Sequence, residues 1–77
     1  RKMTPVYLTN AELEVLFWAA QGRKNKQIAR LLGLSEHTVH HQMQSAKMRL
    51  RAPNRTRAVV LAIKYGNLRL WPEGATE

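Results

Sequence analysis

The sequence predicts an all-α protein, a four-helix bundle, and three observations support this. Apolar residues recur at helical spacing in four segments, residues that start or end helices bound each segment, and no segment alternates with the period of a strand. A chain of 77 residues has room for one domain and not for a large enclosed substrate cavity. We therefore expect a single domain over residues 1–77, with its core within about residues 8–68.

The first helix is predicted to start near Asn10. Thr9 can cap its free amides, and Glu12 follows three residues later, which is the spacing of a capping box. Gly22 supplies a left-handed residue that ends the helix. The residues expected to face the core are Leu13, Leu16, Phe17 and Ala20.

The next two helices are predicted to be separated by a very short turn. Asn25 is the expected cap of the second helix, because Lys24 has no side-chain acceptor, and Gly33 ends that helix. Ser35 is expected to cap the third helix and Pro53 to end it. The inward-facing residues are predicted to be Ile28, Ala29, Leu31 and Leu32, followed by Val39, Met43, Ala46 and Leu50.

A fourth helix is predicted between a cap at Asn54 and a stop at Gly66. Apolar residues surround nearly its whole circumference, so part of its surface must be covered from elsewhere. Two alternatives are open, a tail that folds back over the helix and a homodimer that forms through it. The covering residues would be Leu68, Leu70 and Trp71 in the first case and Val59, Val60 and Ile63 in the second.

The charge of the chain is concentrated in one segment. The formal net charge is +8, and residues 23–57 hold nine cationic residues and a single anionic one, Glu36, so the remainder is neutral. Such a segment attracts polyanions, nucleic acids among them. A solvated surface that keeps the protein soluble is the plainer alternative, but solubility does not require the charge to lie in one segment.

The second and third predicted helices, with their glycine-containing turn, form a helix-turn-helix pattern. In this motif the second helix enters the major groove of DNA, and the first crosses the backbone. The outer face of that second helix carries hydrogen-bonding and cationic residues and no carboxylate. We expect base contacts from His40, His41 and Gln44. The expected phosphate contacts are Lys24, Asn25, Lys26, Ser35, Thr38, Lys47, Arg49 and Arg51.

A set of short motifs is spread over Leu8 to about Leu68. These motifs are Leu8-Thr9, Glu12, Glu14-Val15-Leu16, Gly22, Asn25-Lys26, Ile28-Ala29, Leu32, Leu34-Ser35, Thr38-Val39, Leu50, Asn54-Arg55-Thr56, Ala58-Val59 and Gly66. In them the chain resembles the C-terminal DNA-binding domain of LuxR-type bacterial transcription regulators. The resemblance implies double-stranded DNA as the partner, a homodimer through the fourth helix, and a place at the C-terminal end of a longer regulator.

Three single positions refine this resemblance. A tryptophan at position 18 makes the chain resemble the quorum-sensing branch of the family, whose members carry an acyl-homoserine-lactone domain ahead of this module. Response-regulator members of the family are the alternative. His40 and Gln44 stand where relatives commonly carry cations, so the resemblance does not imply a particular DNA sequence. RNA polymerase is a candidate further partner.

Several other functions find no support in the sequence. The chain has no cysteine, which is compatible with the reducing cytoplasm where we expect it, and no apolar run approaches the ~20 residues that span a bilayer. It lacks catalytic and phosphate-loop motifs, so we expect neither an enzyme nor a cofactor. His37, His40 and His41 have the spacing of metal ligands, but no cysteine completes a coordination shell, and we expect no metal.

Two further binding functions are kept as alternatives. The helix-turn-helix pattern also fits the DNA-binding end of a bacterial sigma factor, although the capped apolar fourth helix suits LuxR-type regulators better. A basic helical module that docks on an acidic protein or a membrane surface is the alternative from another class.

Overall fold

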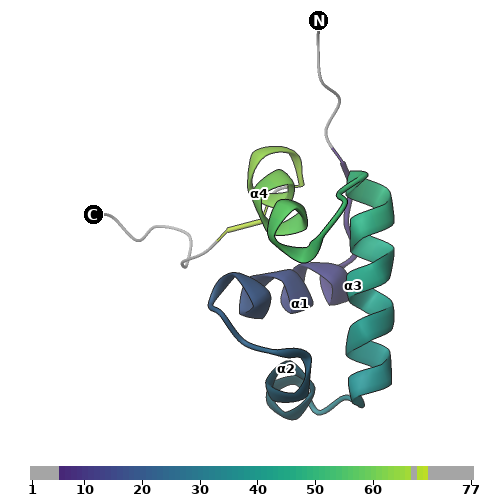
Figure 1. The fold of residues 1–77 in the computed structure, drawn as a ribbon, viewed down its shortest axis with the longest axis vertical. Coiled ribbons are helices and arrows are strands. Elements are labelled where there is room, and N and C mark those ends of the chain that lie inside the picture. Colours follow the sequence, from purple (N-terminus) through teal and green to yellow (C-terminus); the bar gives the residue numbers. More distant parts are fainter. Residues whose placement is uncertain (1–5, 67, 70–77) are drawn as a thin grey trace, which may run out of the picture.

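The computed structural model describes residues 6–66 and 68–69. This part of the chain consists of four helices, α1 (Asn10–Ala20), α2 (Asn25–Leu32), α3 (Glu36–Leu50) and α4 (Arg55–Tyr65), and it contains no strand. α1 lies between α2 and α4, and α3 packs against each of the other three helices (Figure 1). The predicted all-α, four-helix fold is confirmed.

Three of the four helices begin with the caps that the sequence predicts. The Thr9 hydroxyl accepts the Glu12 N–H at 3.1 Å, and the Glu12 carboxylate accepts the Thr9 N–H at 2.9 Å, which completes the capping box. The Ser35 and Asn54 side chains each accept the amide three residues later, at 3.0 and 2.8 Å. These caps satisfy amides that would otherwise lack a partner within the helix.

The predicted cap of α2 is wrong. Asn25 is the first residue of the helix, and Lys24 occupies the cap position without a capping bond from its side chain. Instead, the Gln27 side-chain oxygen accepts the Lys24 N–H at 2.9 Å. Asn25 does not cap because its side-chain oxygen accepts a hydrogen bond from Arg55, which no local pattern could reveal.

All four helices contribute to the core, α3 with four buried apolar residues and each of the others with two. All four inward-facing residues predicted in α3 are buried. Two predictions elsewhere are wrong. Val15 of α1 is fully buried although it was not among the residues expected to face the core, and Leu31 of α2, which was expected to face inward, is 51% exposed. α1 is covered on three sides, by α2, α3 and α4, which widens its buried face, whereas α2 packs only against α1 and α3.

The chain after α4 returns to the core. Gly66 ends α4 as predicted, with a φ of −105° that is not left-handed. Glycine is favoured there because a Cβ would lie 2.7 Å from Cδ1 of Leu8 and 3.1 Å from two backbone atoms of Ala62. Leu68 is buried, and its N–H donates to the Ala62 carbonyl at 3.0 Å, which confirms its predicted place over the fourth helix. The other expected covering residues, Leu70 and Trp71, lie outside the described residues.

Candidate nucleic-acid interface

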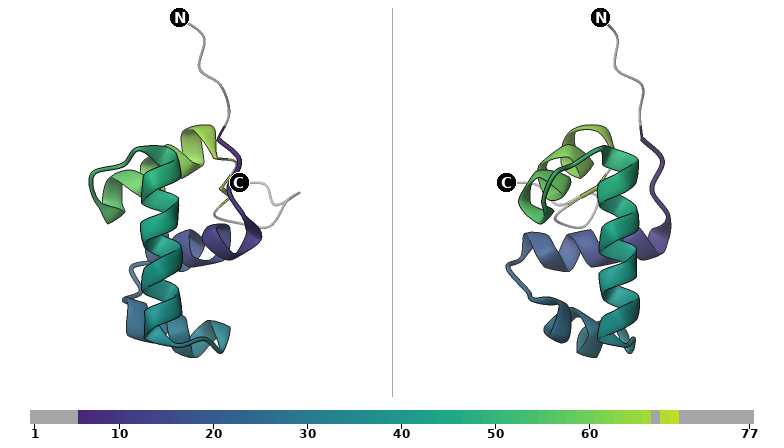
Figure 2. Two further views of the ribbon diagram at one scale, coloured as in Figure 1. Left: turned by 90° about the vertical axis from the view of Figure 1, so that its right-hand side faces the viewer. Right: turned by 45° about the vertical axis from the view of Figure 1, so that its right-hand side comes forward.

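α2 and α3 are joined by a tight turn that sets their mutual orientation. Gly33 adopts a left-handed conformation with a φ of 69°, and the Leu34 N–H donates to the Ala29 carbonyl at 2.8 Å. The Ser35 cap then starts α3. In Figure 2 (left), α3 runs in front of α1 and α4, with α2 beside its N-terminal end. The outer face of α3 is therefore free to meet a partner.

Polar and cationic side chains occupy this outer face of α3. His40, His41 and Gln44 are exposed, and Lys47 is half-buried beside them. From His37 to Arg51 the chain contains no carboxylate. Imidazole, amide and ammonium groups can all donate hydrogen bonds, which suits them to base-edge acceptors and to phosphate oxygens.

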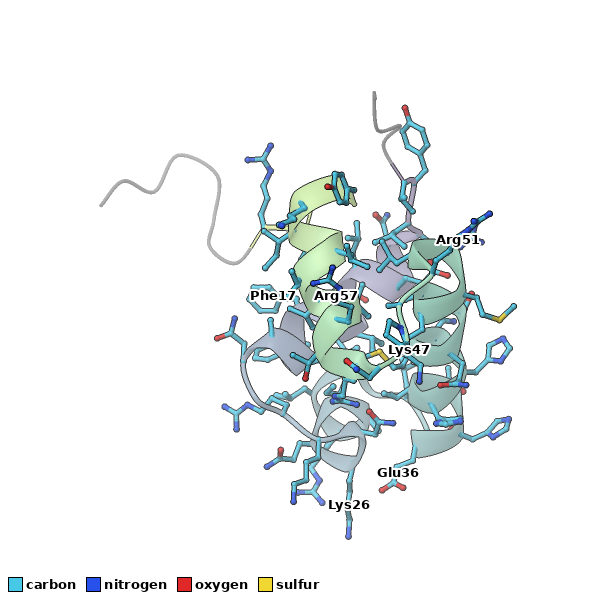
Figure 3. The ribbon with its side chains drawn as sticks, turned by 45° about the horizontal axis from the view of Figure 1, so that its top comes forward. Phe17, Lys26, Glu36, Lys47, Arg51 and Arg57 are labelled. Carbon is cyan, nitrogen blue, oxygen red and sulfur yellow. The ribbon has the colours of Figure 1, made fainter. Side chains whose placement is uncertain are left out.

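Further predicted phosphate contacts lie at the start of α2 and along α3. Lys24 and Lys26 are exposed at the start of α2. Figure 3 shows Lys26 near one end of the molecule, Arg51 near the opposite end of α3, and Lys47 between them. The cations thus extend along the length of the helix-turn-helix, as a phosphate backbone running past it requires.

Ser35 and Thr38 are bonded to each other at the start of α3. The Ser35 hydroxyl accepts the Thr38 N–H and donates to the Thr38 hydroxyl oxygen, both at 3.0 Å. Ser35 is exposed and Thr38 is half-buried, so both hydroxyls remain at the edge of the outer face. The Thr38 hydroxyl keeps its own proton to donate to a phosphate, whereas the Ser35 hydroxyl would have to release its bond to Thr38 to do so.

Arg55 connects α4 to the segment before α2. Its Nη1 donates to the Asn25 side-chain oxygen at 2.5 Å, and its Nη2 donates to the Arg23 carbonyl at 2.6 Å. Burial lowers the pKa of Arg55 from its ordinary value. The predicted phosphate ligand Asn25 therefore has its side-chain oxygen engaged inside the protein. Sequence reasoning missed Arg55 because its partners lie 30 and 32 residues away.

Arg49 is also engaged inside the protein. Its Nε donates to the Glu12 carboxylate at 3.0 Å, and the Ser45 hydroxyl donates to the same carboxylate oxygen at 2.7 Å. The Glu12 side chain is 1% exposed, whereas that of Arg49 is 49% exposed. The sequence identified Glu12 as a capping residue and missed its second role, which joins the start of α1 to the recognition-helix candidate α3.

The carboxylate of Glu12 is held in its charged form. Burial alone would raise the pKa of Glu12, but the hydrogen bonds from Ser45, from the Thr9 amide and from Arg49, with the charge of Arg49, outweigh it. The net result is a pKa below the ordinary value. Glu12 therefore contributes a negative charge at neutral pH that anchors α3 against α1.

Arg51 has an unusual backbone conformation at the end of α3. Its φ of 55° and ψ of 41° are left-handed, and it is the non-glycine residue with positive φ in the described part of the chain. This conformation normally favours glycine and costs an L-residue about 1–2 kcal/mol. The Arg51 side chain is exposed, so packing does not explain why arginine stands there.

We expect Arg51→Gly to separate the effect of this position on folding stability from its effect on DNA affinity. The free energy of unfolding should stay unchanged or rise by up to about 1 kcal/mol, because glycine relieves the left-handed strain. DNA affinity should nevertheless fall several-fold, with a shallower salt dependence, if Arg51 makes the phosphate contact expected from the sequence. Thermal unfolding and salt-dependent titration would measure both effects. Arg51→Lys should retain the affinity, and full affinity in Arg51→Gly would refute the phosphate contact.

α4 leaves part of its apolar surface uncovered. Val59 and Val60 are half-buried, and Ile63 is 44% exposed, while Ala58 and Ala62 pack into the core. Leu68 is buried and bonded to Ala62, and the three residues named above keep exposed surface beside it. The residues predicted for a dimer contact thus lie at the surface of the single chain.

Together these features define a class of protein, a helix-turn-helix domain with a cationic recognition face. Within the described ranges, no three His, Asp or Glu residues come together in a way that could hold a metal ion. Nor does any helix in that part have the length and apolar character needed to cross a bilayer.

Comparison with known proteins identifies the family. The pattern described as "Bacterial regulatory proteins, luxR family" matches residues 6–62. The regulator RpaR of Rhodopseudomonas palustris is 43% identical over 63 residues, which cover 82% of this chain and 26% of RpaR. The activator LuxR of Aliivibrio fischeri is 36% identical over 66 residues, which cover 86% of this chain and 26% of LuxR. The chain therefore belongs to the luxR family of bacterial regulatory proteins.

A solved structure agrees with this assignment. The crystal structure of the phage VqmA–DPO complex matches with a TM-score of 0.71 and 32% identity, over 86% of this chain and 30% of the other. The chain spans about a quarter to a third of the length of these relatives. It is the DNA-binding helix-turn-helix domain of a transcription regulator family that is not enzymatic, and the family match decides against the sigma-factor alternative.

Proposed function

We propose that this domain binds double-stranded DNA sequence-specifically as a homodimer, with α3 in the major groove and α4 at the dimer contact. The outer face of α3 carries the proposal, because it is uncovered and rich in donors and contains no carboxylate from His37 to Arg51. A carboxylate on that face would repel the phosphates on both sides of the groove.

The proposed roles follow from exposure and bonding. The exposed side chains of His40, His41 and Gln44 read base edges. Asn25 acts through its side-chain NH₂ group, which stays a donor because Arg55 bonds only the side-chain oxygen. Arg49 acts through the guanidinium nitrogens that do not bond Glu12. The other phosphate contacts are Lys24, Lys26, Ser35, Thr38, Lys47 and Arg51.

Replacing Gln44 and Lys47 separately should distinguish base contacts from phosphate contacts. Gln44→Ala should relax the preference at one base pair, with a loss of about 1–3 kcal/mol on the preferred sequence only. Lys47→Ala should weaken binding to all sequences alike and lower the salt slope by about one. Titrations of both variants against specific and random duplexes at several salt concentrations would measure this. Equal losses on both duplexes for Gln44→Ala would refute its base-reading role.

We propose further that the domain is the output module of a longer cytoplasmic regulator. Several relatives are named for quorum sensing, RpaR among them, and this chain spans about a quarter of their length. A domain that senses a small signal would precede this module in that arrangement. RNA polymerase is a proposed further partner, reached from the surface that faces away from the DNA.

Selection of bound sequences from a random duplex pool tests the function directly. We expect an inverted repeat with half-sites about one helical turn apart, because a two-fold dimer presents two α3 helices at that spacing. Binding should fall steeply as salt increases, whereas anionic lipid vesicles should bind weakly. Recovery of no common sequence, or vesicle binding as tight as DNA binding, would overturn the proposal.

A further inference from the structure

α3 exposes one large apolar side chain, that of Met48. It is 78% exposed, and it is the only exposed large hydrophobic residue on this helix. The residues around it on the outer face are polar or cationic. Since Met48 makes so little contact with the rest of the domain, its apolar character contributes little to the fold.

Met48 lies on the same side of α3 as the proposed base-reading residues, one helical turn beyond Gln44 toward the C-terminal end of the helix. It follows Gln44 by four residues and His41 by seven, so the three side chains fall within an arc of roughly 60°. Arg51, a proposed phosphate contact, follows three residues later. A partner that meets Gln44 and Arg51 on this face therefore also meets Met48.

The major groove offers one apolar feature, the C5-methyl group of thymine. A flexible, polarisable thioether adapts well to such a small apolar target. We propose that Met48 is a specificity-determining residue that selects thymine by contact with this methyl group. This inference rests on the proposed function, with α3 lying along the groove.

The helix geometry also places the thymine. From Gln44 to Met48 the helix rises about 6 Å, which is close to two base-pair steps of about 3.4 Å. The selected thymine should therefore lie about two base pairs from the base pair that Gln44 reads. This register can be checked independently of the strength of the contact.

Replacing single thymines by deoxyuracil in the selected DNA site tests the proposal, because this change removes only the C5-methyl group. For the wild-type domain, one such replacement in a single half-site should weaken binding about threefold to fivefold, as expected for one buried methyl group. The same replacement should have no further effect on Met48→Ala. Met48→Leu, which keeps an apolar side chain of similar volume, should restore the dependence.

The outcomes that would overturn the proposal are distinct from a failure of the proposed function. Equal sensitivity to uracil in the wild type and in Met48→Ala would overturn it, as would a wild type that is indifferent to every thymine methyl. The same is true if the sensitive thymine lies far from the base pair relaxed by Gln44→Ala. A wild-type domain that selects no sequence at all would instead contradict the proposed function. Thermal unfolding of Met48→Ala should match the wild type, given the exposure of the side chain.

Discussion

Glu12→Gln should lower the free energy of unfolding by about 2–3 kcal/mol. The buried carboxylate of Glu12 accepts from the Thr9 amide, the Ser45 hydroxyl and Arg49 Nε. An amide has the same shape, but its NH₂ group cannot accept from Ser45 and Arg49, so buried donors face each other. Arg49 is half-exposed and can turn to water, which limits the loss. In a domain of this size the melting temperature should fall by roughly 10–20 °C.

Glu14→Gln provides a matched control, since it removes the same charge from an exposed position on the same helix. Its effect on unfolding should be within about 0.5 kcal/mol. Comparable losses in the two variants would show that total charge, and not the bonds of Glu12, determines the effect.

The decrease in the free energy of unfolding caused by Glu12→Gln should also depend on pH. The pKa of Glu12 is lowered in the folded state, because its hydrogen bonds and Arg49 outweigh the effect of burial. The stability that this provides is complete above the unfolded-state pKa of about 4.3 and is lost as pH falls through the lower folded-state pKa. The difference between Glu14→Gln and Glu12→Gln should therefore shrink as the pH falls below about 4. A difference that stays constant from pH 7 to pH 3 would contradict this assignment.

Ile63→Asp should reduce affinity for the two-half-site DNA by about 10²–10³-fold. In the proposed dimer, the two domains bind as a linked pair, and loss of the dimer removes the gain from their high effective concentration. Ile63 is 44% exposed in the single chain, so the substitution should change its thermal unfolding little. Affinity for a duplex with a single half-site should be almost unchanged. Titration against both duplexes, with sedimentation of the free protein and of the complex, would measure these effects.

Lys64→Gln serves as the control for this variant, because it changes the formal charge by the same amount at the neighbouring exposed position. It should bind the two-half-site DNA nearly as well as the wild type. Binding by Ile63→Asp that matches this control would rule out α4 as the dimer contact, and an equal loss on the single half-site would point to misfolding instead.

Local interactions explain why most of the fold could be predicted. The caps at Thr9, Ser35 and Asn54 each join a side chain to an amide three residues away, so residue type and spacing are sufficient to identify them. The buried face of α3 follows from helical periodicity in the same way. The failures at Val15 and Leu31 arise because periodicity identifies an apolar face but not how many neighbours cover it.

The residues expected at the DNA surface also fall into two groups, those that local spacing could place and those whose partners lie far away in the sequence. The sequence places His40, His41, Gln44 and Lys47 on one helical face without a carboxylate, and this depends only on helix geometry. It could not show that Arg49 bonds Glu12, 37 residues away, or that Arg55 bonds the side-chain oxygen of Asn25, 30 residues away. The identity of a cationic or polar residue does not show whether its side chain faces solvent or bonds a residue far away in the sequence.

The order of the helices, their caps, the cationic segment and the family thus follow from the amino-acid sequence, because each depends on residues close together in the chain. The partners of Glu12 and Arg55 and the close approach of Gly66 to Leu8 were decided only when the helices packed. Packing brings together groups that lie 30 residues or more apart, and their contacts depend on the positions of whole helices rather than on local spacing.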